Sequence, residues 1–322
     1  MDTNHSDLPD TLDLLTDTEE ADEAATLHSQ KPQKASYEAN AQVQRWLREQ
    51  ESARAGTKPP FNPSFLAHQR DRPWVLSSLA TFYEEDLITD VLSVVKSGKE
   101  ATVYCCAAHP STGLEYVAAK VYRPRMFRSL RNDAVYRASR PQVDAQGREG
   151  RGARRWNATA KETERGRAAM VSAWIRYEYE TQRLLYDAGA DTPRPLAQSG
   201  NAVLMEYIGG GPGEPAPLLR EVTLERAKAI PLFERVLRNI ELWLACDRIH
   251  GDLSSYNMLY WDGAITIIDF AQAVDPRYNL AVGELLARDI ARVCQYFTRC
   301  GVAADAASLA SDLWQRYLRA EV

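Results

Sequence analysis

Three polar side chains in the last third of the chain have types and a spacing suited to phosphoryl transfer from a nucleotide. Asp252 precedes Asn257 by five residues, and Asp269 follows twelve residues later, directly after the apolar run 265–268. This reaction needs one carboxylate beside the nucleophile, with an amide and a second carboxylate to hold a divalent metal. We therefore expect Asp252 to orient or accept the proton of the attacking hydroxyl. Asn257 and Asp269 are expected to bind Mg²⁺, with Mn²⁺ as a second candidate.

The segments between these residues must bring them together. Asp252 and Asn257 share one loop, the pair Asp262-Gly263 predicts the tight turn of a short hairpin, and the strand that follows would return Asp269 to that loop. His250 is expected to brace the loop through a hydrogen bond rather than to act as a base. Taken singly, each of these residues fits an ordinary polar position beside a core strand, so only the constellation argues for a site.

Upstream, apolar and β-branched runs separated by turn sequences begin near residue 91 and predict three antiparallel strands. The first turn contains Gly98, which lets backbone N–H groups approach phosphate oxygens closely, although one glycine in a turn also fits an ordinary hairpin. The residues expected to line a nucleotide there are Ser97, Gly98, Lys99, Glu100 and Val103.

Lys120 lies inside an apolar strand, where an uncompensated ammonium group is costly, so a counter-charge is expected beside it. We expect Lys120 to contact the α- and β-phosphates and to be held by a glutamate from the helix predicted at about 162–188. Glu178 and Glu180 flank the apolar stripe of that helix on opposite sides, so periodicity does not choose between them. The stripe consists of Trp174, Tyr177, Leu184, Leu185 and Ala188.

Two further strand-like runs end at about residue 208, and the glycine-rich stretch 209–213 that follows is typical of a linker between two lobes. Met205, Glu206 and Ile208 are expected to present backbone groups to an adenine ring. The Met205 side chain would lie behind the ring, although a methionine in a strand is usually a core residue. Three helices are predicted after the linker, at about 233–244, 280–300 and 304–320.

The composition gives further limits. The chain has 322 residues, 45% of them apolar, which is enough for the core of one two-lobed domain. Its first 23 residues hold nine acids and no lysine or arginine, which predicts a disordered tail over 1–60 before a folded domain at 61–322. The sequence has no secretory signal and no apolar run near the ~20 residues that span a membrane. Five cysteines without metal-ligand spacing fit a reducing cytoplasm.

Helical periodicity at about 74–92 predicts a helix that leads into the domain. An arginine-rich insert is expected at 123–161, after the strand that carries Lys120. Residues 123–155 contain ten arginines and three acids. Guanidinium groups suit phosphate or RNA backbone, but we favour the interpretation of a solvated loop above the active site. Aromatic residues are sparse there, so the insert offers no stacking platform for RNA bases.

Together these segments resemble the RIO family of atypical protein kinases, specifically its type-1 branch. The resemblance spans roughly residues 85–300 and is carried by SGKEATVY, AAKVYR, EYETQRLL, VLMEYIG, PAPLL, HGDLSSYNMLY and IIDFAQAV. It implies an α+β, two-lobed protein-kinase-like fold of trimmed type, with a small antiparallel-sheet N-lobe at about 72–208 and a mostly helical C-lobe at about 214–322. It also implies that the helix glutamate is the second of the pair, Glu180.

The resemblance further implies an ATP- and Mg²⁺-dependent serine/threonine protein kinase that autophosphorylates and hydrolyses ATP. Family members act in small-ribosomal-subunit maturation, so ribosomal particles become candidate partners. Two positions depart from the family pattern, Gly251 and Phe270, and neither removes a reactive group. One alternative is an ATP-driven conformational switch in which Asp269 accepts phosphate transiently. Another is a small-molecule phosphotransferase of the antibiotic-kinase type, which also uses a His-Gly-Asp-Leu loop; the SGKEA loop argues against it.

Overall fold

The computed structural model describes residues 58–66, 71–123, 164–278 and 282–322, with side chains of the long helix after the insert described from residue 171. Every described residue belongs to one compact unit. The predicted acidic tail up to residue 57 and nearly all of the arginine-rich insert lie outside the described residues. The domain boundary at residue 60 therefore stays a prediction.

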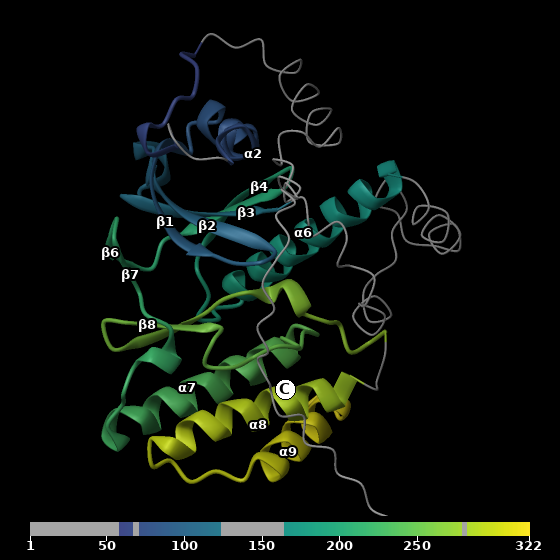
Figure 1. Ribbon diagram of the computed structural model, residues 1–322. Coiled ribbons are helices and arrows are strands. Elements are labelled where there is room, and N and C mark those ends of the chain that lie inside the picture. The colour runs from purple at the N-terminus through teal and green to yellow at the C-terminus, as the bar shows by residue number, and fades with distance from the viewer. Residues whose placement is uncertain (1–57, 67–70, 124–163, 279–281) are drawn as a thin grey trace, which may run out of the picture. The chain divides into compact units, whose positions relative to one another are not determined.

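A five-stranded antiparallel sheet forms the first part of the unit, as Figure 1 shows. Its strand order is β1-β2-β3-β5-β4, with β1 (Ile88–Ser97), β2 (Ala101–Ala108), β3 (Tyr116–Tyr122), β4 (Pro195–Ser199) and β5 (Ala202–Glu206). The three predicted strands and the two later ones are thus confirmed.

The helical periodicity predicted over 74–92 is wrong at its C-terminal end. The helix α2 (Arg72–Glu84) stops before Asp86, which adopts a left-handed conformation with φ 57°. That turn reverses the chain, and β1 starts at Ile88 and pairs with β2. Strand pairing, and the burial of Ile88 and Val91 in the core between the sheet and α2, outweigh a helical pattern that the sequence alone continues.

The two faces of the sheet pack on different helices, and this difference sets the position of Lys120. On β3, Val117, Ala119 and Val121 belong to the core formed with α2. Because side chains alternate along a strand, Lys120 and Tyr122 point to the opposite face, where Tyr122 packs with Trp174 of α6 (Glu164–Asp187). Figure 1 shows α2 and α6 on opposite faces of the sheet.

The apolar stripe predicted for α6 is only partly confirmed. Trp174 and Leu185 are buried, whereas Leu184 is 39% exposed and Ala188 is exposed. Ile175, which the prediction omitted, is fully buried against the sheet. The contact face of α6 therefore lies on the side of Ile175.

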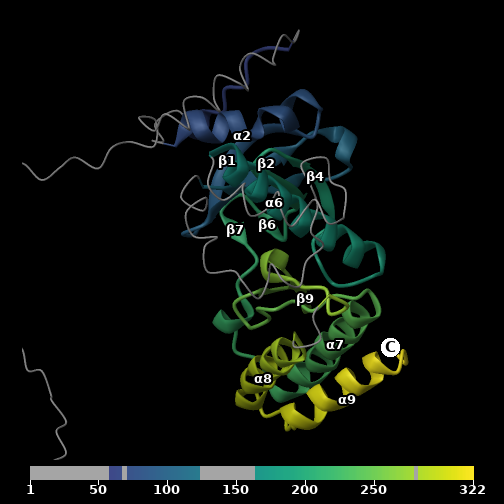
Figure 2. The same ribbon diagram turned by 90° about the vertical axis from the view of Figure 1, so that its right-hand side faces the viewer.

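The second part of the unit is mostly helical and surrounds one large apolar core (Figure 2). Its helices are α7 (Arg226–Ala245), α8 (Gly283–Arg299) and α9 (Ala306–Leu318), and its hairpin consists of β8 (Met258–Trp261) and β9 (Ala264–Ile267). The expected α+β architecture, a small antiparallel sheet followed by a mostly helical part, is confirmed.

Short elements connect the two parts. After β5, the chain forms a small hairpin of β6 (Gly209–Gly211) and β7 (Glu214–Pro215) at the glycine-rich stretch, and the turn η5 (Leu219–Glu221) follows. The turn η6 (Phe270–Gln272) follows β9, and its Ala271 packs into the cluster between α6 and the sheet.

Within the stretches described, no helix combines the length and the apolar character needed to cross a membrane.

Candidate active site

The β8–β9 hairpin brings Asn257 and Asp269 to the same place. Asp262 and Gly263 occupy its turn with φ angles of 48° and 79°, which is the left-handed pair that a tight two-residue hairpin requires. The N–H of Ile268 donates to the carbonyl of Asn257 over 3.0 Å, so Asp269 lies one residue beyond this link. The expected reversal of the chain is therefore present.

The loop before β8 holds Asp252 and Asn257 in contact. The Asn257 amide Nδ2 donates to the backbone oxygen of Asp252 at 2.9 Å and lies 3.4 Å from its carboxylate Oδ2. Gly251, immediately before, has φ 77°, a conformation that glycine adopts without the cost a side chain would bring. The glycine at this position, one of the two departures from the family pattern, thus suits the backbone of the loop.

His250 braces this loop from inside the core. Its Nδ1 accepts the N–H of Asp252 at 3.3 Å, and its Nε2 lies 3.2 Å from the carbonyl oxygen of Ile268. Burial lowers the pKa of His250 below its usual value, against the opposing effect of Asp269 and Asp252. The ring packs against Phe270 at 4.9 Å. A buried neutral imidazole with both nitrogens engaged agrees with the structural role expected for it.

Lys120 connects the sheet, α6 and the segment after β9. Its Nζ lies 2.7 Å from Glu178 Oε1 and 2.8 Å from Asp269 Oδ1. Tyr122, two residues along the same face of β3, donates its hydroxyl to the other oxygen of Glu178. The side chains of Lys120 and Glu178 are 13% and 4% exposed, so the pair is buried and its charges are matched.

The choice of Glu180 as the partner of Lys120 is wrong. Glu180 is exposed on the far side of α6, whereas Glu178 follows Trp174 by one turn on the side that faces the sheet. Residues two apart in a helix lie about 200° apart around its axis, so only one of the two glutamates can face β3. Ile175, three residues before Glu178, is fully buried against the sheet, so the packing of α6 places Glu178 on the side that faces Lys120.

The charges of this cluster support one another. Burial alone would lower the pKa of Lys120, but Asp269 and Glu178 raise it well above the usual value, so the amine stays protonated. Burial likewise opposes the ionisation of Asp269. This side chain nevertheless remains 43% exposed, and the charge of Lys120 together with its hydrogen bond holds the Asp269 pKa below the usual value. Asp269 therefore offers an ionised oxygen to the solvent side of the cluster.

The predicted phosphate loop lies between β1 and β2. Gly98 donates its N–H to the carbonyl of Ala101 at 2.9 Å, closing a tight turn that includes Lys99 and Glu100. Ser97 ends β1, and Val103 of β2 pairs directly with Lys120 of β3. A Cβ atom added to Gly98 would lie 3.2 Å from the Ala101 oxygen, so glycine suits this close approach.

Arg123 stabilises this loop, a role that the sequence analysis did not assign. Its guanidinium donates to Ser97 Oγ at 2.6 Å and to Thr102 Oγ1 at 2.8 Å, and its N–H donates to the Glu100 carbonyl at 2.7 Å. The first arginine of the predicted insert is therefore part of the turn between β1 and β2.

The segment expected to meet an adenine ring lies at the end of β5. Met205 is half-buried, and its sulfur accepts a long hydrogen bond of 3.7 Å from Gln182 Nε2. The backbone N–H of Glu206 donates to the carbonyl of Arg194, and the carbonyl of Ile208 accepts the N–H of Ala216. Those two backbone groups are engaged within the protein, so the adenine contacts expected of this segment would have to use its other backbone groups.

One face of α8 holds the loop that carries Asp252, and the sequence analysis did not predict these contacts either. The buried carboxylate of Asp289 accepts the N–H of Gly251 at 2.7 Å and the N–H of Leu253 at 3.1 Å. Burial raises the pKa of Asp289 to about 7, against the effect of these hydrogen bonds. One turn further along α8, Arg292 Nη1 lies 2.7 Å from Asp252 Oδ1. Both contacts join residues about 40 positions apart, which no local pattern reveals.

A family model described as RIO domain matches residues 103–309, which run from within β2 through the other strands and most of the helical part, but leave out β1. The chain belongs to the RIO domain family.

Its similarity to curated RIO kinases is clear in sequence. The RIO-type serine/threonine-protein kinase Rio1 of Thermoplasma acidophilum is 35% identical over 136 residues, which cover 42% of this chain and 69% of that protein. The human serine/threonine-protein kinase RIO1 is 30% identical over 219 residues, covering 67% of this chain and 35% of the human protein. The match to the Caenorhabditis elegans RIO1 kinase spans only 26% of that protein.

Among solved structures, the Rio2 kinase–ADP/Mg²⁺–phosphoaspartate complex of Chaetomium thermophilum aligns with this RIO domain at a TM-score of 0.45 and 17% identity. The alignment covers 87% of this chain and 91% of that one.

The donor set of the RIO domain fits a magnesium ion held jointly with a nucleotide. The Asn257 amide nitrogen is directed to Asp252, which leaves its oxygen as the ligand atom, and Asp269 presents an ionised carboxylate one residue beyond the link to Asn257. Oxygen ligands of this kind are those Mg²⁺ prefers, with phosphates and water completing the shell. Among the described residues, no group of three or more His, Cys, Asp or Glu side chains could hold a metal by itself.

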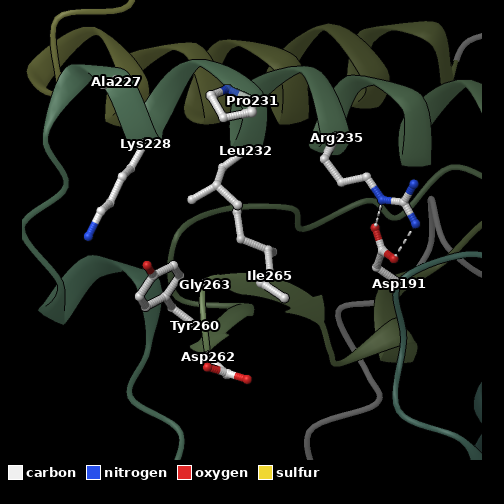
Figure 3. Close-up of a pocket in the computed structure, with 11 residues that line it drawn as sticks. Asp191, Ala227, Lys228, Pro231, Leu232, Arg235, Tyr260, Asp262, Gly263 and Ile265 are labelled. Carbon is white, nitrogen blue, oxygen red and sulfur yellow. Dashed lines mark hydrogen bonds and ion pairs between the residues drawn. The ribbon is translucent and has the colours of Figure 1, made fainter.

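A separate pocket of about 750 Å³ lies between α7 and the β8–β9 hairpin (Figure 3). Figure 3 shows Tyr260 and Ile265 from the hairpin side facing α7, and Arg235 of α7 paired with Asp191. Lys120, Asp252, Asn257 and Asp269 do not line it, so this pocket is distinct from the candidate active site.

Proposed function

We propose that this RIO domain is an ATP-dependent serine/threonine protein kinase that transfers the γ-phosphate of ATP to protein hydroxyls, with autophosphorylation and ATP hydrolysis. One observation carries the proposal. Lys120 of the sheet forms ion pairs with both Glu178 of α6 and Asp269 of the segment after β9, so it links the sheet to the helical part. The curated relatives that bear the name serine/threonine-protein kinase add support.

The residues would act as follows. Lys120, held by Glu178, would neutralise the α- and β-phosphates, and the turn around Gly98 would cover the phosphates with backbone N–H groups. Asn257 and Asp269 would hold Mg²⁺, or Mn²⁺ in its place, which neutralises charge that develops on the transferred phosphoryl group. Asp252 would accept the proton of the attacking hydroxyl. The oxygen of that hydroxyl would form a bond to the γ-phosphorus while the bond between this phosphorus and the ADP oxygen breaks.

The test is transfer of labelled phosphate from ATP to the protein itself and to added protein. We expect Asp252→Ala to abolish labelling, because no other group in the loop is placed to take the proton, while ATP binding is retained. Asp312→Ala is the matched control, since it removes an exposed carboxylate on α9 whose side chain is 63% exposed. Wild-type labelling in Asp252→Ala would contradict the assignment.

A second candidate is an ATP-driven switch in which Asp269 itself receives the phosphate. Its support is the 43% exposure of the Asp269 side chain at the edge of the Lys120 cluster, where a carboxylate oxygen could attack the γ-phosphorus. A hydroxylamine-sensitive phosphoenzyme, formed in a single turnover and lost in Asp269→Asn, would favour this candidate. Robust phosphorylation of added protein without such a species would favour the kinase.

Membership in the RIO family argues against the small-molecule phosphotransferase considered from the His-Gly-Asp-Leu loop. We further propose the type-1 branch, on the names of the curated relatives, and a cytoplasmic location, on five cysteines that are all free. Small-subunit ribosomal particles or RNA, met through the arginine-rich insert, remain proposed partners. Co-purification of the particles with the tagged protein tests that association.

A further inference from the structure

Two arginines from different elements flank the catalytic loop. Arg292 of α8 forms an ion pair with Asp252, and the two side chains are 40% and 48% exposed. Arg220 of η5 contacts the same loop at Tyr256, where its guanidinium carbon is 4.1 Å from the centre of the ring. Tyr256 lies between Asp252 and Asn257 in sequence and is 54% exposed. Both cations therefore lie at the solvent face of the loop that carries the proposed base.

Hydrogen bonds fix these elements to one another. The Tyr296 hydroxyl donates to the carbonyls of Leu219 at 2.9 Å and Val222 at 3.1 Å, which ties η5 to α8. Arg292 precedes Tyr296 by one helical turn and so lies on the same side of α8. The N–H of Arg220 donates to the carbonyl of Ser255 at 3.2 Å, which ties η5 to the catalytic loop as well. The elements that carry the two arginines are thus held to one another and to the loop.

The positive charge of this surface is available to a ligand. Glu221, the acid adjacent to Arg220, turns back to accept the N–H of Leu218 at 3.2 Å. Arg220 itself is exposed, and its stacking on Tyr256 leaves the edge of the guanidinium open to a carboxylate. A guanidinium carries five N–H donors, so Arg292 can hold Asp252 and a second carboxylate at the same time.

We propose that the surface formed by Arg220, Tyr256 and Arg292 binds the protein segment that carries the acceptor hydroxyl, and that it selects a serine or threonine flanked by carboxylates. This inference rests on the proposed kinase function and names its substrate class. The hydroxyl must reach Asp252, so residues on either side of it pass over the two arginines. Opposite charge there lowers the free energy of the bound segment and also raises its rate of encounter.

The chain supplies the probe for this surface. Residues 1–23 contain nine acids, no lysine or arginine, and five hydroxyl residues among those acids: Thr3, Ser6, Thr11, Thr16 and Thr18. A synthetic peptide with this sequence is compared with a matched peptide in which every Asp is Asn and every Glu is Gln. The full-length protein, Mg²⁺ and labelled ATP are used with both peptides, and kcat and KM are measured separately.

Three variants separate binding from chemistry. Arg220→Gln is expected to raise KM for the acidic peptide roughly two- to fivefold, the scale of one exposed ion pair at a binding site, with little change in kcat. Arg292→Gln is expected to raise the same KM and also to lower kcat with both peptides, because it releases Asp252. Arg319→Gln is the control, since it removes an exposed arginine after α9 whose partner is Glu321.

The outcomes divide cleanly. Preference for the acidic peptide, reduced in Arg220→Gln and retained in Arg319→Gln, supports the proposal. Equal labelling of both peptides overturns it while leaving the kinase function intact. ATP-dependent autophosphorylation with neither peptide labelled also overturns it, and absence of any phosphoprotein refutes the kinase function separately. Competition by single-stranded RNA that is lost in Arg220→Gln, with no preference between peptides, would assign the surface to RNA instead.

Discussion

Replacing Glu178 with alanine would remove the partner that two buried groups share. The Lys120 amine would keep only Asp269, and the hydroxyl of Tyr122, which is 2% exposed, would lose its acceptor. Removing one member of a buried ion pair typically costs about 3–5 kcal/mol. Because Asp269 still compensates Lys120, we expect the lower end, roughly 3 kcal/mol of unfolding free energy, and a KM for ATP raised about tenfold or more.

Glu178→Gln and Glu180→Ala sharpen this test. Glutamine keeps the shape and hydrogen-bonding capacity but removes the charge, so we expect a smaller cost, about 1–2 kcal/mol, close to that of one charge-assisted hydrogen bond. Glu180 is exposed on the same helix, and its replacement by alanine should change the unfolding free energy by no more than about 0.5 kcal/mol.

The assay is urea unfolding followed by circular dichroism at pH 7.5, with KM for ATP measured on the same preparations. Both glutamates lie in α6 and are two residues apart, so helix propensity cancels in the comparison. A Glu180→Ala cost equal to that of Glu178→Ala, or a Glu178→Ala variant indistinguishable from the wild type, would refute the assignment of the ion pair.

Two further predictions follow from residues that hold the site. Asp289, with a pKa raised to about 7 by burial, keeps a proton in the folded protein that the unfolded chain releases near 3.8, so its contribution to stability should fall as pH rises from about 4 to 7. Urea unfolding across this range should show a slope, on the order of 4 kcal/mol in total, that is absent in Asp289→Asn; an unchanged slope in the variant would contradict the pKa. Arg123→Ala should raise KM for ATP about three- to tenfold without altering the KM for an acceptor peptide, because it frees Ser97 and Thr102 of the phosphate turn. Steady-state kinetics with each substrate varied in turn distinguishes this result from a general loss of activity.

The sequence by itself determined the parts of the site that depend on local patterns. Asp252 and Asn257 lie five residues apart in one loop, Asp262-Gly263 specifies its own turn through left-handed φ angles, and a lysine inside an apolar strand requires a counter-charge. Alternation along the strands and the period of the helices depend on neighbouring residues only, so the sheet and most helices were also predictable.

Only the tertiary structure decided which side chains meet across the fold. Glu178 and Glu180 are equivalent by periodicity, and the packing of Trp174 and Ile175 on the sheet selects Glu178. Asp289 and Arg292 reach the catalytic loop from α8, almost 40 residues away, because the large apolar core fixes the position of that helix. A contact across such a separation depends on how whole elements pack, which is a property of the complete fold rather than of any segment of the sequence.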